Sequence, residues 1–420
     1  MLFDNFAAAE AALLWGAFAI ALVMGLVVNK TNFCTMGAVS DLVNMGDTGR
    51  MRAWLFAIAV AVLGVAVLEF LGLVDVTGTF PPYRAGNLIW AENILGGLMF
   101  GIGMTLASGC GNKCLIRIGG GNLKSVVVFA IIALIAYFML SPFPGSDQTL
   151  MSLLFYDWIR PLSVNLGSSQ DLGYLLGGES AVTVRLGIGL VLCLALTAYA
   201  FRSVDFRGSR DNILGGLVVG LAVVGAWYLS SNIQVESFDG NVSLSTYYNQ
   251  WDMLADSEAG KPAQGRPLAP QSYTFINPMA QALGYAAGGF ERSLLNFGVM
   301  AVFGVVLGSL LWALISRSFR IEWFSSLHDA LNHVIGAVLM GFGGTLAMGC
   351  TVGQAITGVS TLALGSFLTF GAIFLGSALT MKVQYYKMVY EDEATLGKAM
   401  VTGLVDLRLL PERFRRLEAV

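Results

Sequence analysis

Nine separate stretches of this chain run for about 20 residues with few or no charged side chains. A transmembrane helix needs about that many mostly apolar residues to cross the hydrocarbon core of a bilayer. Only 12% of the 420 residues are charged, whereas soluble domains carry roughly 25%. The sequence therefore predicts an all-α polytopic membrane protein. The nine predicted helices cover approximately residues 8–28, 53–73, 91–108, 124–140, 182–201, 212–231, 293–315, 332–348 and 361–381.

The same numbers exclude other classes of protein. A disordered chain needs low hydrophobicity and high net charge, but 56% of these residues are hydrophobic and the net charge is −3. Nucleic-acid binding is not expected, because the chain has no long basic run to neutralise phosphates.

The Lys and Arg residues of the connecting loops predict an orientation. If the N-terminus is outside, 18 of the 24 Lys and Arg residues lie on the inner side, as expected for cytoplasmic loops. The C-terminus is then cytoplasmic. Residues 141–181 and 232–291 become long periplasmic loops with short surface helices. Residues 1–390 form the transmembrane domain, and residues 391–420 form a cytoplasmic tail with an amphipathic helix.

A ten-residue pattern occurs twice, at an offset of 240 residues. Residues 101–110 read GIGMTLASGC and residues 341–350 read GFGGTLAMGC, with seven of ten positions identical. In the predicted topology the first copy runs inward and the second outward. This arrangement predicts two inverted-topology repeats, about 12–140 and 211–381, with a site near the middle of the membrane. Trp227-Tyr228 falls near the expected counterpart of the loop around Cys34, so that cysteine is not expected to be duplicated.

Each copy of the pattern ends in Gly-Cys and is followed by a polar, glycine-containing stretch. Non-helical backbone at membrane depth is tolerated only where it lines a cavity or is buried in protein. We therefore expect a helix break after Cys110 and after Cys350. The helix that follows each break would point its N–H groups toward an anion. Close helix packing would also explain the glycines, but it would not explain the repeated cysteine.

The chain has five cysteines, an odd number that argues against a disulfide framework. Zinc is not expected, because there is no C-x-x-C pair and only two histidines are present. Cys34, Cys110 and Cys350 lie at expected helix breaks and suggest a path of thiols. Cys114 could share a helix face with Cys110, as a redox pair or a site for a soft metal such as Cu(I). Cys193 is interpreted as a packing residue.

Three motifs in this order resemble the YeeE/YedE sulfur-transport family. They are NFCTMGAVSD at 32–41, SGCG at 108–111 with RIGGGNLK at 117–124, and GCTVGQ at 349–354. The resemblance covers about residues 12–380. It implies an inverted-repeat fold with broken helices near the centre, in a bacterial inner membrane. It also implies uptake of thiosulfate, which Cys34, Cys110 and Cys350 pass inward through transient S–H···S hydrogen bonds without covalent chemistry.

The expected partners are thiosulfate, membrane lipid and a cytoplasmic sulfur-carrier protein of the TusA type, with no cofactor, no metal and no enzymatic activity. Polar residues near the cysteines are predicted to support substrate binding. These residues are Asn32, Ser108, Asn112, Lys113, Arg117, Asn122, Thr351 and Gln354. The positive-inside rule alone would equally explain the cations. Glu69, a carboxylate within a predicted helix, is expected near the outer interface.

Two alternative functions remain open. One is a membrane thiol-redox enzyme that uses Cys110 and Cys114. The other is a transporter of another sulfur or selenium species, or of a soft metal.

Overall fold

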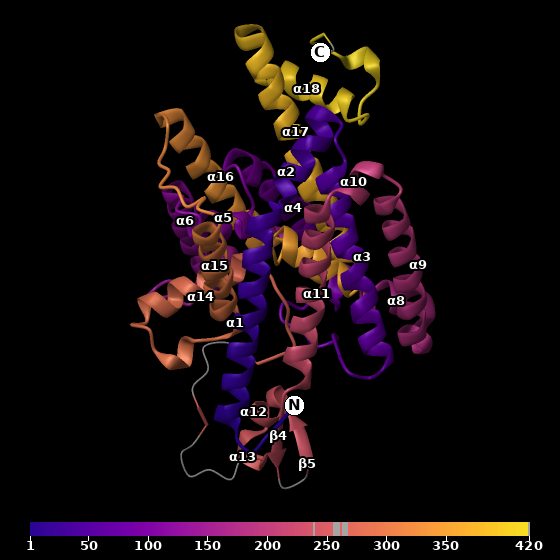
Figure 1. Cartoon of the computed structure of the whole chain (residues 1–420), viewed down its shortest axis with the longest axis vertical. Helices are drawn as coiled ribbons and strands as arrows, with labels where there is room; N and C mark the ends of the chain where they lie inside the picture. The colour runs from indigo at the N-terminus through magenta and orange to yellow at the C-terminus, as the bar shows by residue number, and fades with distance from the viewer. Residues whose placement is uncertain (238–239, 255–260, 263–267, 419–420) are drawn as a thin grey trace.

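Long helices make up most of the molecule, as the computed structural model shows (Figure 1). The structure describes residues 1–237, 240–254, 261–262 and 268–418. The long helices are α1 (Phe6–Thr31), α3 (Gly49–Phe70), α4 (Trp90–Leu106), α6 (Leu123–Leu140), α9 (Ala181–Phe201), α11 (Arg210–Asn232), α15 (Phe297–Ile315), α16 (Leu327–Leu346) and α17 (Leu364–Tyr390).

Within these described ranges, eight helical stretches are long and apolar enough to cross a membrane. They correspond to eight of the nine predicted segments and confirm the all-α polytopic membrane fold. The ninth segment, 332–348, lies in α16, which is not among the eight. The first two turns of α16 contain His328, Asp329 and His333, and these polar side chains lower its mean hydropathy.

Short helices connect or interrupt the long ones. The α-helical pieces are α2 (Thr35–Ser40), α5 (Gly111–Gly119), α7 (Asp157–Ile159), α8 (Leu172–Gly177), α10 (Val204–Gly208), α12 (Leu244–Asn249), α13 (Trp251–Leu254), α14 (Ile276–Ala287) and α18 (Leu396–Asp406). The π-helical pieces are η1 (Asp41–Met45), η2 (Ser152–Tyr156) and η5 (Val352–Gly358). The 3₁₀ turns are η3 (Gly178–Ser180), η4 (Arg292–Leu294), η6 (Glu391–Glu393) and η7 (Glu412–Phe414).

Two small sheets lie in the connections. Strand β1 (Leu2–Phe3) pairs in parallel with β4 (Gln234–Ser237), which pairs antiparallel with β5 (Gly240–Ser243). This sheet and the helices α12 and α13 lie together at the N-terminal end of the molecule, opposite the C-terminus (Figure 1). The second sheet joins β2 (Ala85–Leu88) to β3 (Val164–Ser169).

Helices α4 and α16 carry the two copies of the repeated pattern and pack against each other through glycines. A Cβ on Gly96 would lie 2.8 Å from the Gly343 carbonyl oxygen, and a Cβ on Gly103 would lie 2.6 Å from the Gly336 carbonyl oxygen. The start of α4 thus meets the end of α16, so the two helices run antiparallel. Gly96 and Gly336 differ by the repeat offset, as do Gly103 and Gly343. The contacts are therefore reciprocal, as two-fold-related copies would make them.

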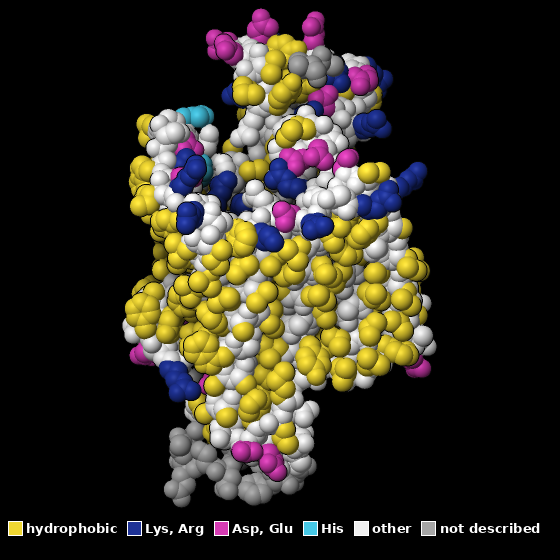
Figure 2. All heavy atoms as spheres, in the orientation of Figure 1, with side chains coloured by type: hydrophobic (Ala, Val, Ile, Leu, Met, Phe, Trp, Pro, Cys, Tyr) yellow, Lys and Arg dark blue, Asp and Glu magenta, His cyan; other side chains and the backbone are white. Residues whose placement is uncertain are grey.

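Charged side chains are distributed unevenly along the molecule. Figure 2 shows a broad band of hydrophobic side chains, with most of the visible Lys and Arg along its upper edge. The end of α17 and the C-terminal residues project beyond that edge (Figure 1). In the tail, α18 packs on α17: a Cβ on Gly403 would lie 3.2 Å from Cβ of Lys382. The predicted amphipathic tail helix, α18, therefore packs against α17 of the same chain.

Part of the predicted loop 232–291 does not stay at the surface. Residues 272–275 enter the core as non-helical backbone, and they and Ile276 have exposures of 6% or less. Helix α14 then packs against α6 and α15. The apolar residues Tyr273, Phe275 and Ile276 explain this burial, because their side chains gain free energy by leaving water. The remainder of that predicted loop includes residues outside the described ranges.

The loop 141–181 also reaches inward. Asp171 is fully buried, and the side-chain oxygen of Gln170 accepts a 3.0 Å hydrogen bond from the Gly365 backbone. The loop therefore contacts the start of α17 and is partly buried, instead of lying entirely at the surface.

Candidate functional site

The first predicted helix break lies around Cys34. Helix α1 ends at Asn32, which adopts a left-handed conformation with φ of 53°. The backbone at Cys34 is extended, and α2 begins at the next residue. The sulfur atom of Cys34 accepts a 3.5 Å hydrogen bond from the backbone N–H of Gly37 and is buried. This break places a thiol at the N-terminus of a short helix inside the protein.

The second and third breaks lie at the ends of the two copies of the repeated pattern. Ser108 and Met348, two residues after the last helical residues of α4 and α16, have φ values of 58° and 55° and are related by the repeat offset of 240 residues. Cys110 directly precedes α5. Cys350 lies just before η5, and its sulfur accepts a 3.5 Å hydrogen bond from the Gly353 backbone. The structure places these breaks at residues 107–110 and 347–350, so each break ends at the cysteine and does not follow it as expected, and helix begins at the next residue.

The fold brings these three cysteines together. A Cβ on Gly111, the neighbour of Cys110, would lie 3.9 Å from Cβ of Cys350. Cys110 interacts electrostatically with both Cys34 and Cys350. Their exposed fractions are 6% for Cys34, 2% for Cys110 and 0% for Cys350. Three buried thiols from three chain segments thus form one cluster.

Buried polar atoms without a hydrogen-bond partner surround this cluster. Such atoms occur in the residues next to the three cysteines, namely Thr35, Asn112, Thr351 and Gln354. An unpaired buried polar group costs roughly 1–3 kcal/mol. Thr351 is 0% exposed and lies beside Cys110. In a binding site for a polar ligand, such unpaired groups are expected until the ligand binds and forms hydrogen bonds with them.

Other predicted supporting residues lie at different places. The ammonium group of Lys113 donates a 2.6 Å hydrogen bond to Asn32 Oδ1 and interacts electrostatically with Cys34 and Cys110. Arg117 lies in the last turn of α5. The side chain of Asn122 instead caps α6, accepts from the Ser125 backbone and donates to Glu322 at 2.6 Å. Asn122 therefore has a structural role that the sequence motif did not reveal.

One residue of the cluster was missed from the sequence. Thr274 is 6% exposed, and its hydroxyl contacts the Cys350 thiol and makes no hydrogen bond to an oxygen or nitrogen atom. The offset of 240 residues pairs Phe33-Cys34 with Tyr273-Thr274, which is the signal that could have found it. Trp227, expected near this position, instead lies within α11 and donates to the Ser360 hydroxyl at 3.3 Å.

The remaining two cysteines have other surroundings. The Cys114 thiol donates a 3.0 Å hydrogen bond to the Ser125 carbonyl. Cys193 lies in α9 and is partly exposed. All five cysteines are free, and the described residues contain no group of three or more His, Cys, Asp or Glu side chains that could hold a metal.

A buried ion-pair network contacts the turn that follows η5, at Thr361. Arg84 donates to both carboxylate oxygens of Glu69, at 2.5 and 2.8 Å, and to the Thr361 carbonyl at 2.8 Å. Arg185 joins Glu69 to Asp171. Burial opposes the charge of Asp171, but hydrogen bonds from Arg185 and Ser169 outweigh it and lower its pKa to about 2. Glu69 is thus a buried ion-pair partner.

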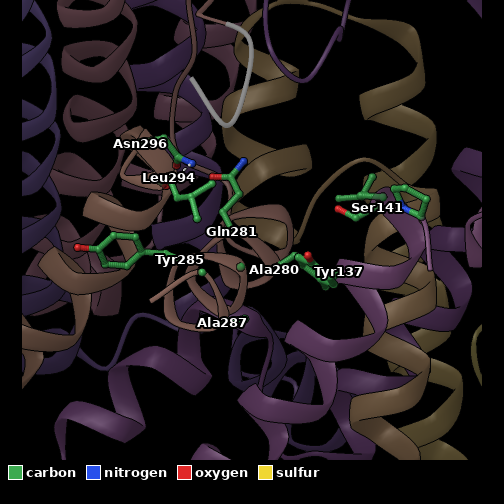
Figure 3. A pocket seen from close by; sticks show the side chains of 12 residues that line it. Tyr137, Ser141, Ala280, Gln281, Tyr285, Ala287, Leu294 and Asn296 are labelled. Carbon is green, nitrogen blue, oxygen red and sulfur yellow. Dashed lines mark hydrogen bonds between the residues drawn. The ribbon is translucent and has the colours of Figure 1, made fainter. Parts of the chain in front are cut away.

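A separate surface pocket lies between α6, α14 and α15. Its volume is about 440 Å³, and Figure 3 shows Gln281, Leu294 and Asn296 on one side with Tyr137 and Ser141 on the other. No cysteine lines it. The thiol cluster is therefore distinct from this pocket.

Comparisons with known proteins agree on one family. The family described as sulphur transport matches residues 30–379. The thiosulfate transporter TsuA of Escherichia coli is 25% identical over 344 residues, which cover 80% of this chain and 84% of the relative. TsuA of Spirochaeta thermophila is 22% identical, over 87% of this chain and 97% of the relative. The probable transporter YedE of Salmonella typhimurium is 29% identical over 24% of this chain and 22% of the relative.

Proposed function

Because the chain belongs to the sulphur transport family, which matches residues 30–379, we propose that it imports thiosulfate across the bacterial inner membrane. The observation that carries the proposal is the cluster of Cys34, Cys110 and Cys350, buried together among unpaired polar groups. Two relatives that span at least 84% of their own length in the match are thiosulfate transporters.

The chemistry of the cluster suits this anion. Thiosulfate has one terminal sulfur atom and three oxygen atoms on its central sulfur. A thiol S–H is a weak donor that matches a soft sulfur acceptor. The hydroxyl and amide groups of Thr35, Asn112 and Thr351 supply harder partners for the oxygens. The substrate passes from thiol to thiol through S–H···S hydrogen bonds, and because no covalent bond changes, no oxidant or reductant is needed.

Neutral thiols are required for this path. A thiolate would repel a divalent anion, and burial in apolar surroundings favours the neutral thiol. The positive charge of Lys113, beside Cys34, attracts the anion toward the inner end of the path. Entry of the anion into a negative cytoplasm costs about 2.3 kcal/mol per charge per 100 mV. A cytoplasmic sulfur-carrier protein of the TusA type would consume the substrate and draw the flux inward.

The proposed orientation places the N-terminus outside and the C-terminus in the cytoplasm. Most visible Lys and Arg side chains lie at the edge of the hydrophobic band that is nearer the C-terminus (Figure 2). This distribution supports the proposed orientation, since inner loops are rich in these residues. The reciprocal contacts of α4 and α16 support two inverted repeats. In this arrangement the substrate moves from Cys350 through Cys110 to Cys34.

Uptake of labelled thiosulfate into proteoliposomes tests the proposal. The wild-type protein should accumulate the label, and Cys110→Ala and Cys350→Ala should each lose most of the uptake. Cys193→Ala, which removes a partly exposed thiol of α9, serves as the matched control and should keep it. Competition by sulfate, sulfite and selenite measures selectivity. Full uptake by both relay variants would contradict the thiol path, and no uptake by the wild type would contradict the proposed substrate.

A further inference from the structure

The counterpart of Cys34 in the second half of the chain is Thr274. Both residues lie at a break of non-helical backbone that enters the core ahead of a short helix, α2 after Cys34 and α14 after Thr274. They differ by 240 residues, the same offset that relates Cys110 to Cys350. The second half therefore has a buried hydroxyl where the first half has a thiol.

The Thr274 side chain lies against the turn that carries Cys350. A Cβ on Gly349 would lie 3.2 Å from Thr274 Oγ1, and a Cβ on Gly353 would collide with the same atom. The two glycines flanking Cys350 thus leave room for this hydroxyl. Thr274 is 6% exposed, and its hydroxyl faces the Cys350 thiol and makes no hydrogen bond to an oxygen or nitrogen atom.

A second hydroxyl lies near Cys350. Tyr83 is 2% exposed, its hydroxyl has no hydrogen-bond partner, and it interacts electrostatically with Cys350. Tyr83 comes from the connection between α3 and α4, a different chain segment from the one that carries Thr274.

A small cavity lies one to three residues along the chain from these groups, although Thr274, Tyr83 and Cys350 do not themselves line it. A cavity of about 180 Å³ is lined by Pro82, which precedes Tyr83, by Met348, two residues before Cys350, and by Asn277 in the first turn of α14. In the proposed orientation this cavity lies on the outer side of Cys350, since it also contacts Leu140 at the outer end of α6.

We infer that the hydroxyls of Thr274 and Tyr83 form an outer subsite, which holds the oxygen atoms of the entering anion while its terminal sulfur meets Cys350. This inference rests on the proposed function and extends it. The outer end of the complete path then has two neutral hydroxyl groups. Its inner end has the thiol of Cys34 and the neighbouring cation of Lys113. Neutral donors at the entrance bind an anion without trapping it by charge.

Variants that remove only a hydroxyl test this subsite. Thr274→Val keeps the shape of the side chain, and Thr274→Ser keeps the hydroxyl. Thr274→Val should raise the KM for thiosulfate uptake into proteoliposomes by about tenfold or more, because hydrogen bonds to a charged group are lost. Thr274→Ser should stay within about twofold of the wild type, and Tyr83→Phe should raise KM in the same direction as Thr274→Val.

The matched control is Thr380→Val, since the Thr380 hydroxyl bonds only to the Gly376 carbonyl of its own helix. This variant should leave KM unchanged. A merely structural role of Thr274 would lower the maximal rate and the thermal stability and leave KM unmoved, which would overturn the inference. Wild-type KM in both Thr274→Val and Tyr83→Phe would also overturn it, provided that the wild type transports thiosulfate and Cys110→Ala does not. No transport by the wild type would instead overturn the proposed function.

Discussion

The ammonium group of Lys113 donates a 2.6 Å hydrogen bond to the side-chain oxygen of Asn32. This bond ties the helix that follows Cys110 to the end of α1, two residues before Cys34. It therefore fixes the relative position of two thiols that belong to different helix breaks. It also holds one positive charge beside the inner half of the proposed path.

Replacing Lys113 with Gln should weaken inward transfer. The amide keeps a hydrogen bond to Asn32 within reach but removes the charge that faces Cys34 and Cys110. We expect KM for thiosulfate to rise by about tenfold, since hydrogen bonds to charged groups contribute roughly 1.5–3 kcal/mol. Kinetics in proteoliposomes measure this change. Lys398→Gln, an exposed cation of α18, is the control and should behave as the wild type.

The glycine crossing of α4 and α16 should not tolerate larger side chains. A Cβ on Gly103 would approach the backbone of Gly336 to 2.6 Å, and backbone atoms cannot move aside as a flexible side chain can. Gly103→Val should therefore destabilise the detergent-solubilised protein by about 1–3 kcal/mol or prevent its folding. Thermal unfolding and the yield of monodisperse protein report the outcome.

Gly371→Ala is the control for this crossing. No atom lies within 4 Å of a Cβ at Gly371, which is part of α17. Alanine should be neutral or stabilise the helix by up to about 1 kcal/mol. Equal stability of Gly103→Val and the wild type would show that the crossing is not close-packed.

The Arg84 network should contribute strongly to stability. The Arg84 side chain is 1% exposed. Without it, the Glu69 carboxylate, which is 6% exposed, keeps only the longer contact with Arg185. Arg84→Ala should lower the free energy of unfolding by roughly 3–5 kcal/mol. Arg84→Lys should recover only part of it, because an ammonium cannot form the two parallel bonds to Glu69.

Thermal unfolding in detergent checks this prediction. Arg160→Ala provides the contrast, since the Arg160 side chain is 50% exposed and lies 3.6 Å from Glu92. Only the Arg160 end of this pair is exposed, since the Glu92 side chain is 6% exposed. Arg160→Ala should therefore cost less than Arg84→Ala but more than the loss of a fully exposed pair, which contributes about 0–1 kcal/mol. If the two variants lost the same amount of stability, the network around Arg84 would have no special role.

Cys114 should be dispensable for transport. Its thiol donates to the Ser125 carbonyl, and a serine hydroxyl at the same position can make that bond. Cys114→Ser should therefore keep uptake within about twofold of the wild type, because the serine hydroxyl preserves the hydrogen bond that this residue makes. Loss of uptake, together with a Cys110–Cys114 disulfide in the purified wild type, would favour the thiol-redox enzyme instead.

The sequence predicted those parts of the site that carry a local signature. Runs of apolar residues located the long helices, and the repeated Gly-Cys step located the breaks at Cys110 and Cys350. Thr274 escaped because threonine is common and its segment lies in a long connection rich in polar residues. Its role depends on the burial of residues 272–276 against the turn at Cys350, which is a contact between distant segments.

Contacts between distant segments also determine the roles of Asn122 and Glu69. Asn122 lies within a motif that resembles the family, yet its amide bonds to Glu322, 200 residues away. Glu69 is the penultimate residue of α3, at the end expected to be outer, and what the sequence did not predict is its burial beside Arg84 and Arg185, which compensate its charge. Neither partnership leaves a pattern in the local sequence.

The reciprocal glycine contacts of α4 and α16 have an evolutionary consequence. In such a contact each helix offers the same surface to the other, so two identical half-length chains inserted in opposite orientations could have formed it as a dimer. Fusion of those halves would free each copy to change on its own. The thiol at position 34 and the hydroxyl at position 274 would then record that divergence between the two halves.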